Sequence, residues 1–239
     1  MKKVAVLVAI GFIIAGLVIG FCGFAVTDFE PENLNMSKII STEHTVNEPF
    51  DSINIENGVS DLRFVLSEDG VCRVVCRDFE NISHPITVEN GVLNILEKDS
   101  RKWYEHIGIF WGETDITVYL PQSEYNALTV KTDTGDIEIE EISAKGIKIE
   151  TSTGDITLKK VIADKLDIES DTGDVELRDS DANDIEINTS TGDVEGRLLS
   201  EKIFTTETST GRINVPKSLK GDSCRITTDT GDIEITIKK

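Results

Sequence analysis

Acidic residues beside Thr-Gly pairs are the first residues in this sequence whose type and spacing could do chemistry. The triplet Asp-Thr-Gly occurs at residues 133–135, 171–173 and 229–231. Aspartic proteases use such a triplet, but their chemistry needs two of these carboxylates facing each other and sharing a proton. Here the triplet is one variant of a turn that also accepts Ser in place of Asp, so we do not expect a protease.

A second set of carboxylates comes directly after the glycines, and it comprises Asp136, Asp155, Asp174 and Asp193. Stacked above one another, their oxygens could hold Ca²⁺, which prefers hard oxygen ligands. The GGxGxD nonapeptide of calcium-binding β-rolls is absent, and solvated Asp is ordinary at a turn. Calcium is the one candidate metal, and no other cofactor is expected.

No catalytic residue emerges from the remaining side chains. The 44 Asp and Glu residues do not single out the pair of carboxylates that a glycosidase needs. His44, His84 and His106 are scattered, and phosphate-binding and nucleophile motifs are absent. The formal net charge of −20 argues against nucleic-acid binding, which depends on Lys and Arg.

Six Thr-Gly pairs recur along the second half of the chain at intervals of 19, 19, 19, 19 and 20 residues. They begin at residues 134, 153, 172, 191, 210 and 230. Self-similarity at a fixed period indicates stacked repeats. The glycines permit the positive-φ corners that a coil of this length needs. They are Gly135, Gly154, Gly173, Gly192, Gly211 and Gly231.

Apolar and polar residues alternate on both sides of each pair. In the second copy Ile147 and Ile149 precede the pair, and Ile156 and Leu158 follow it. Period two indicates strands with one buried face. An antiparallel meander would show the same alternation, but equivalent positions in every copy favour stacking of like on like, about 4.8 Å apart. We predict an all-β fold, a parallel β-solenoid with 19-residue coils stacked in chain order.

Stacking also puts like charges on neighbouring coils, where they repel. The residue before each Thr runs Asp133, Ser152, Asp171, Ser190, Ser209, Asp229. Alternating Asp with Ser, and placing Arg212 after the fifth Gly, reduces this repulsion. Lys238 and Lys239 end the chain and are expected to protect the last sheet edge from pairing.

The N-terminus has the pattern of a membrane anchor. Lys2 and Lys3 precede an uncharged apolar run, residues 4–26, which is long enough to cross a ~30 Å hydrocarbon core as a helix. The positive flank stays in the cytoplasm. We predict a single-pass membrane protein with its C-terminal domain extracytoplasmic. A cleavable signal peptide is the alternative.

The predicted organisation is an anchor over residues 1–27, a polar spacer over 28–45 and a solenoid over 46–239. Within the solenoid, residues 46–127 form irregular first coils that cap one end, and 128–239 form six regular repeats. Cys72 and Cys76 share one face of a strand, roughly 13 Å apart, too far to pair, and are expected to be buried.

The segment 101–112 concentrates aromatic residues. It contains Trp103, Tyr104, Phe110 and Trp111. Exposed aromatics in a loop are a candidate binding patch. The alternative is that they pack back against the solenoid wall.

The chain resembles the bacterial putative-adhesin β-strand-repeat family, a domain of unknown function. The resemblance rests on FDSINIENGVSDLRFVLS, DITVYLP and the recurring TxTGDIxI, and it covers residues 46–239. It implies a right-handed, single-stranded β-helix on the cell envelope, and it implies no catalytic residues. Some relatives lie beside envelope-stress signalling systems.

Three functions are therefore weighed. The first is a non-catalytic adhesin or envelope-interaction module that binds a cell-envelope or host-surface polymer or protein. The second is a regulatory ectodomain of an envelope-stress system. The third is a polysaccharide-active enzyme, which rests only on analogy with other β-helices.

Overall fold

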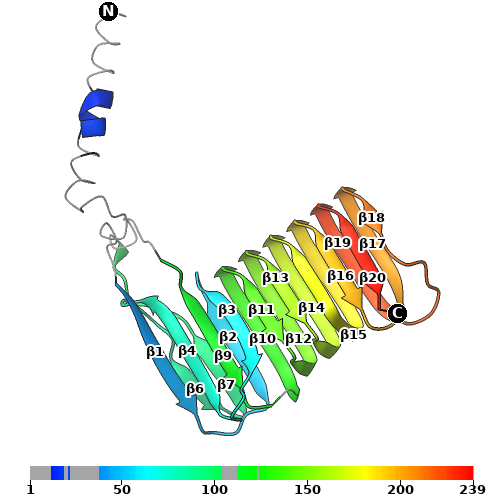
Figure 1. Cartoon of the computed structure of the whole chain (residues 1–239), viewed down its shortest axis with the longest axis horizontal. Helices are drawn as coiled ribbons and strands as arrows, with labels where there is room; N and C mark the ends of the chain where they lie inside the picture. The colour runs from blue at the N-terminus through cyan, green and yellow to red at the C-terminus, as the bar shows by residue number, and fades with distance from the viewer. Residues whose placement is uncertain (1–11, 19–20, 22–37, 104–111, 123, 239) are drawn as a thin grey trace, which may run out of the picture.

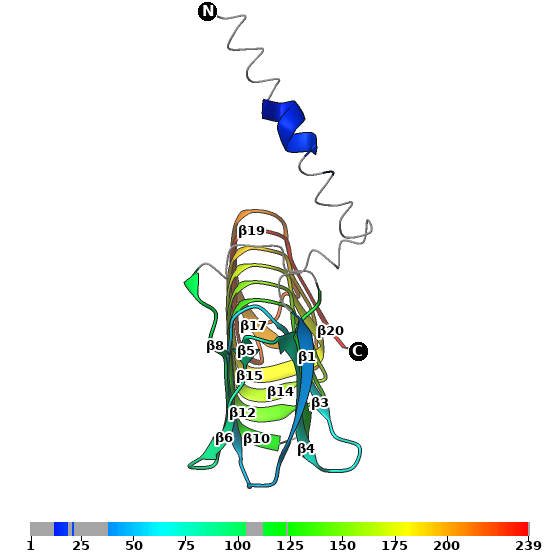
Figure 2. The same cartoon turned by 90° about the vertical axis from the view of Figure 1, so that its left-hand side faces the viewer.

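The computed structural model of the chain describes residues 12–18, 21, 38–103, 112–122 and 124–238. Residues 38–238, within that described part, form a solenoid in which two walls of β-strands face each other, as the view along its length shows (Figure 2). Each regular repeat gives one rung, which consists of one strand in each wall and a Thr-Gly corner between them. The all-β, solenoid-like architecture predicted from the repeat is confirmed.

We call the first wall the long-strand wall. Its strands in spatial order are β6 (Ile86–Glu89), β7 (Val92–Leu96), β2 (Ser52–Asn57), β10 (Glu124–Thr134), β12 (Ser143–Thr153), β14 (Ile162–Thr172), the second half of β15 (Val175–Thr191), β19 (Asp222–Thr230) and β17 (Lys202–Thr210). All pairings except β6–β7 are parallel.

The opposite wall is the short-strand wall. Its strands in spatial order are β1 (Ile39–Val46), β4 (Cys72–Phe79), β9 (Asp115–Leu120), β3 (Asp61–Leu66), β11 (Ile137–Glu140), β13 (Ile156–Lys159), the first half of β15, β16 (Val194–Leu198), β20 (Ile233–Ile237) and β18 (Ile213–Asn214). The short strands β5 (Ile82–Ser83) and β8 (Lys98–Asp99) pair separately.

Alternating apolar residues fill the space between the walls. Leu128, Ile147, Leu166 and Ile185 lie above one another in register, and all are at most 1% exposed. Burying one such side chain contributes about 1.5–3 kcal/mol. The core is thus an aliphatic column, as the scarcity of aromatic residues predicts.

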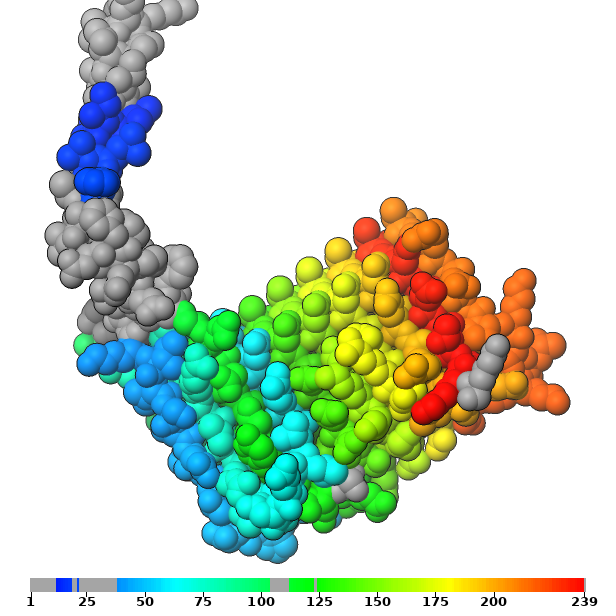
Figure 3. All heavy atoms as spheres, in the orientation of Figure 1, coloured from blue at the N-terminus to red at the C-terminus, as the bar shows by residue number. Residues whose placement is uncertain are grey.

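The last two repeats do not stack in chain order. β19 pairs with β15 on one side and with β17 on the other, and β20 lies likewise between β16 and β18. The red rung therefore lies inside the orange one (Figure 1, Figure 3). The prediction that all six copies follow one another in space is wrong for this end: the sixth repeat is inserted between the fourth and the fifth.

A buried lysine holds this arrangement. The Nζ of Lys202, at the start of β17, donates to the carbonyl of Ala182 at 2.7 Å and lies 2.7 Å from Oδ1 of Asp181 and 3.7 Å from Oδ2 of Asp222. These partners belong to the fourth and sixth repeats, so one side chain of the fifth repeat joins all three. A buried charge left without its partner would be costly.

β20 is consequently not the last strand of its wall. The amide of Lys238 donates to the carbonyl of Leu198, and its Nζ lies 3.3 Å from Asp179. β18 pairs only with Ile233 and Glu234 of β20, so the expectation that Lys238 protects the edge beside it stays a prediction. Lys239 lies outside the described residues.

The N-terminal end is closed by antiparallel strands. β2 and β3 form the rung directly below the first regular repeat, although residues 72–120 follow them in the chain. Beyond them β4 pairs antiparallel with β9, β1 with β4, and β6 with β7. The rung pattern stops here because the strand direction reverses.

The predicted anchor falls mostly outside the described residues. Residues 12–18 are helical. Within the described part of the chain, no helix has both the length and the apolar character needed to span a bilayer.

Candidate functional site

The Thr-Gly corners form a column along one side of the solenoid. Their glycines have φ between +127° and +157°. A Cβ on Gly154 would lie 2.1 Å from the carbonyl oxygen of Gly135 in the rung below, and Gly173 meets Gly154 in the same way. Both the backbone conformation and the close stacking of rungs therefore require glycine.

The carboxylates after the corners form a hydrogen-bonded ladder. Oδ1 of Asp136 accepts the amide of Asp155 at 2.8 Å, Asp155 accepts that of Asp174, and Asp174 that of Asp193. The ladder begins at Asp61 and continues through Asp232. The four calcium candidates are thus brought together in one column, but one oxygen of each already accepts a backbone amide.

The ladder ends on Arg212. Its amide donates to Oδ1 of Asp232, and its guanidinium pairs with Oδ2 of the same carboxylate at 2.5 and 2.9 Å. No further rung lies beyond it in the described structure, so no amide there needs an acceptor. The Asp-to-Arg change in the fifth repeat therefore marks the terminal rung, a signal present in the sequence.

In the spatial order of the rungs, Asp and Ser alternate without exception at the position before each corner Thr. From the first rung outward the residues before each Thr are Asp133, Ser152, Asp171, Ser190, Asp229 and Ser209. In chain order two serines are adjacent. Like charges directly opposite each other on neighbouring strands are destabilising, so the alternation fits the inserted order better than the chain order.

Outward-facing charges cover both walls. A groove on the long-strand wall crosses four rungs and is lined by residues that include Glu150, Ser152, Glu169 and Asp171. Nζ of Lys148 lies 2.6 Å from Glu150 and holds the pKa of that carboxyl below its usual value. The groove is therefore anionic at neutral pH.

The short-strand wall has a mixed pattern. Arg63 and Lys159 both pair with Glu138, and Arg197 pairs with Asp179 at 2.6 Å. Exposed ion pairs such as these contribute about 0–1 kcal/mol each. Their effect is to neutralise most of the basic charge on this wall within the protein.

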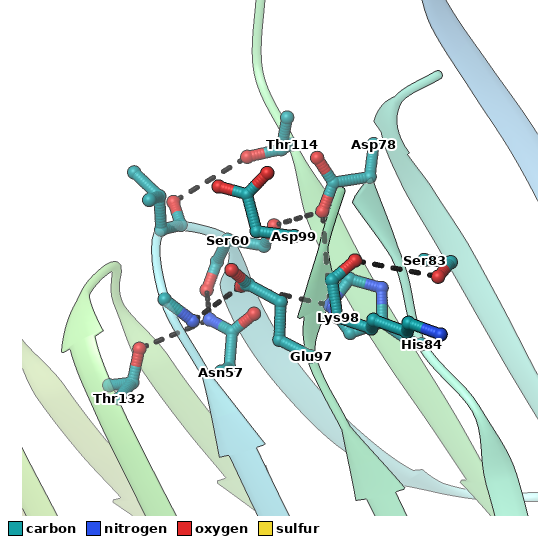
Figure 4. Close-up of polar contacts among 12 residues, drawn as sticks. Asn57, Ser60, Asp78, Ser83, His84, Glu97, Lys98, Asp99, Thr114 and Thr132 are labelled. Carbon is teal, nitrogen blue, oxygen red and sulfur yellow. Dashed lines mark hydrogen bonds and ion pairs between the residues drawn. The ribbon is translucent and has the colours of Figure 1, made fainter. Parts of the chain in front are cut away.

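The capped end contains a polar cluster that the chain order conceals (Figure 4). The side chain of His84 is 1% exposed, and its Nε2 lies 3.9 Å from carboxylate oxygens of both Asp78 and Glu97. Oγ of Ser60 donates to Asp78 at 2.9 Å, and the amide of Gly58 donates to Glu97 at 2.6 Å. His84 is thus not isolated, contrary to the expectation from its spacing in the sequence.

His84 lies against a pocket of about 290 Å³ that His44 and Cys76 also line. Burial lowers the pKa of His84, and the carboxylates of Asp78 and Glu97 act in the opposite direction. Neither ring nitrogen has a hydrogen-bond partner within the described residues. Both ring nitrogens of His84 can therefore form a hydrogen bond with a small polar group in this pocket.

The three cysteines that the structure describes are in environments that disfavour the thiolate, the nucleophilic form. Cys72, Cys76 and Cys224 are free and buried, as predicted for the first two. Burial raises the pKa of Cys72 to about 11, and that of Cys76 and of Cys224 to about 12. Within the described residues, no group of three or more His, Cys, Asp or Glu side chains is arranged to hold a metal ion.

Only part of the aromatic segment 101–112 lies within the described residues. Trp103 is 78% exposed. Tyr104, Phe110 and Trp111 lie outside the described residues, so the choice between a binding patch and packing against the wall stays open for them.

The fold and the repeated corners identify the family. Residues 50–239 match the Toastrack DUF4097 family. The chain belongs to this family. The resemblance to a β-strand-repeat family of putative adhesins, drawn from the motifs above, is confirmed.

Two solved structures share the Toastrack fold. A putative cell adhesion protein from Clostridium sporogenes is 16% identical, with a TM-score of 0.51 over 84% of this chain and 100% of the other. A putative adhesin from Bacteroides fragilis is 18% identical, with a TM-score of 0.52 over 83% and 97%. None of the curated proteins matches the chain in sequence.

Proposed function

We propose that this Toastrack protein is a non-catalytic, extracytoplasmic binding module that residues 4–26 anchor in the membrane. Its partner is a polymer or protein of the cell envelope or of a host surface. The observation that carries this proposal is the groove on the long-strand wall, which is lined by the same positions of the repeat in four successive rungs. A repeating surface suits a repeating or extended ligand.

The charge of the groove limits the chemical class of the partner that can bind there. Glu150, Glu169 and Asp171 line it, and the chain has a net charge of −20. A polyanionic partner would be repelled at this wall, whereas a neutral or cationic one would not. The proposed partner therefore carries neutral sugars or basic groups.

The absence of catalysis is part of the same proposal. The Asp ladder uses its carboxylates to accept amides of the next rung, which fits a structural role. Incubation with envelope polysaccharides is expected to release no reducing sugar, and release above the buffer control would contradict the proposal. Calcium dependence stays a prediction, tested by melting the protein with and without a chelator.

Two matched triple variants test whether the partner binds to the long-strand wall. The first neutralises Glu150, Glu169 and Asp171 as Glu→Gln and Asp→Asn, and the second makes the same number of neutral changes at Glu176, Glu195 and Glu234 on the short-strand wall. We expect the first to lose binding to envelope fractions by about tenfold or more, and the second to change it less than twofold. Equal binding by both variants and the parent would remove the groove as the binding surface.

A further inference from the structure

The pocket at the capped end lies on the inner side of the short-strand wall. Ile40, Thr42 and His44 line it from β1, and His84 lines it from the turn between β5 and β6. The three β1 residues share the side-chain direction of Val46, which is buried at the end of that strand. The volume of about 290 Å³ is close to the lower end of the range for small-molecule sites, about 300–1,000 Å³.

His84 is a buried polar side chain without a partner. Its side chain is 1% exposed, and neither ring nitrogen has a hydrogen-bond partner within the described residues. Native proteins keep few such groups, because burying a polar atom without a partner is unfavourable. His84 therefore points to a ligand that supplies this partner.

Two carboxylates approach the same nitrogen of this ring. Nε2 of His84 lies 3.9 Å from Oδ2 of Asp78 and 3.9 Å from Oε2 of Glu97 (Figure 4). Each of these oxygens already accepts one hydrogen bond, from Oγ of Ser60 or from the amide of Gly58, and a carboxylate oxygen has a second lone pair. With the lone pair of a neutral imidazole, three acceptors are thus grouped around one point.

The charge around His84 is negative. The carboxylates of Asp78 and Glu97 both act on its ring. Asp99 lies in the same cluster (Figure 4) and pairs with the guanidinium of Arg101 through both of its oxygens. Among these described residues three carboxylates face one guanidinium, and no described Lys or Arg lines the pocket. An anionic ligand is therefore disfavoured, and a cationic one is favoured.

The distances fit an ammonium group better than a zinc ion. At Zn–ligand distances of about 2.0–2.1 Å, atoms 3.9 Å apart would subtend roughly 140° at the metal, far from the tetrahedral ~109°. An ammonium nitrogen about 2.8 Å from the same atoms would see them at roughly 90°, which is nearer to tetrahedral. An ammonium group also has three N–H donors for the three acceptors.

The rest of the pocket suits an alkyl chain on that nitrogen. Ile40 is 43% exposed, and it lines the pocket together with Ile82 and Pro85. Apolar side chains beside an anionic cluster select a ligand that has a charged head and an apolar body, because the chain then buries apolar surface.

We propose that the pocket beside His84 binds the primary ammonium group of a small alkylamine. Asp78 and Glu97 accept two of its N–H groups, and Nε2 of His84 accepts the third. Ile40 and Ile82 contact the alkyl chain. The pocket shares no residue with the groove of the long-strand wall, so this proposal does not rest on the proposed function.

Titration of the ¹⁵N-labelled full-length chain in a non-ionic detergent tests the site. The probe is n-butylammonium, and the readout is the resonances of the His84 ring nitrogens, for which we expect a saturable shift. n-Butanol and butyrate have similar chains without the positive charge, and we expect them to bind at least tenfold more weakly. Ethanolamine, the amine of a lipid headgroup, is expected to bind at least threefold more weakly than n-butylammonium, because the pocket wall is apolar.

Carboxylate variants connect the binding to the cluster. Glu97→Gln keeps the size of a side chain that is 17% exposed and removes its charge, and we expect it to weaken n-butylammonium binding at least fivefold. Asp78→Asn is the second variant if Glu97→Gln lowers the melting temperature. Glu89→Gln, at an exposed position on β6 of the same end, is the matched control and is expected to stay within twofold.

Four results would overturn the proposal. They are no saturable shift of His84 with n-butylammonium, equal binding of n-butanol, unchanged binding by a folded Glu97→Gln chain, and tighter binding of ethanolamine than of n-butylammonium. The triple wall variant at Glu150, Glu169 and Asp171 is expected to keep the His84 shift. Loss of the shift in that variant would also overturn the proposal, because the probe would then bind in the groove.

Discussion

The two ends of the solenoid finish in different ways. At the N-terminal end the strand direction reverses, so β1 and β4 close the short-strand wall with antiparallel pairs, and a buried polar cluster around His84 lies beneath them. At the C-terminal end the parallel rungs simply stop, and β17 and β18 keep a free edge. Both ends keep edge strands in the described structure, β1 and β6 at one end and β17 and β18 at the other, but only at the C-terminal end does the edge continue the parallel rungs.

The comparison shows how the last two repeats are held at an end that has no antiparallel strands. Inserting the sixth repeat between the fourth and the fifth places β20 between two strands. The exposed position passes to the fifth repeat, whose Lys202 is anchored to Asp181 two rungs away. At this end the buried side chain of Lys202 joins the fourth, fifth and sixth rungs.

The largest expected effect concerns corner glycines. Gly154→Ala forces a Cβ to 2.1 Å from a carbonyl at φ +138°, in a rung held on both sides. We expect a loss of about 2–6 kcal/mol in unfolding free energy from backbone strain and overpacking together. Gly211→Ala makes the same clash in the terminal rung, which can move outward, so its loss should be smaller. Urea unfolding measures both, with Gly146→Ala, where a Cβ meets nothing within 4 Å, as control.

The second effect concerns the buried ion pair of the open end. Lys202→Met leaves Asp181 buried without its cation, and the expected loss is about 3–5 kcal/mol. Adding Asp181→Leu should restore much of it, because no unpaired charge then remains. Urea unfolding of the single and double variants checks this. If Lys202→Met alone is as stable as the parent, the ion pair does not hold the terminal rung.

The third effect concerns the Asp ladder. Asp155→Ala removes the acceptor for the amide of Asp174, and we expect a loss of about 1 kcal/mol. Asp155→Asn keeps an acceptor oxygen and should lose less. Arg212→Ala lies at the open end, where no further amide needs an acceptor, and should stay within about 0.5 kcal/mol. Thermal melts rank the three variants, and an equal loss for all of them would show that the ladder has no preferred end.

The smallest effect concerns the pH dependence of the capped end. Burial lowers the pKa of His84 in the folded chain below its ordinary 6.5. Between these two pKa values the unfolded chain binds a proton that the folded chain does not, so stability falls as the pH drops below about 6.5. His84→Gln should reduce this loss, and His44→Gln, at an exposed position on β1, serves as control. Identical pH slopes for the parent and His84→Gln would show that His84 is not excluded from protonation.

Much of the fold could be predicted because the strands and corners follow from short-range periodicity in the sequence. The alternation around Ile147 and Ile149 predicts the buried faces, and the spacing of the Thr-Gly pairs predicts the corners. The order of the rungs could not be predicted in this way, because the local sequence allows any two copies to pair equally well. The signals were indirect: Arg212 in place of Asp, two adjacent serines at Ser190 and Ser209, and a last interval of 20 residues.

The polar cluster could not be predicted from the sequence. Asp78, His84 and Glu97 come from irregular coils with no repeat to align them. Their meeting depends on the antiparallel strands of the cap. The residues of the Asp ladder, by contrast, were predicted as a column, but their role as acceptors for the next rung needed the backbone geometry.

Disulfide trapping tests the central claim, the inserted rung order, most directly. In the Cys22→Ser chain, Ser190→Cys paired with Asp229→Cys places two cysteines on neighbouring strands, about 4.8 Å apart and within disulfide range. Ser190→Cys paired with Ser209→Cys places them two rungs apart, at roughly 10 Å, beyond that range. We predict that mild oxidation joins the first pair and not the second. Oxidation of the second pair without the first would show that the repeats stack in chain order.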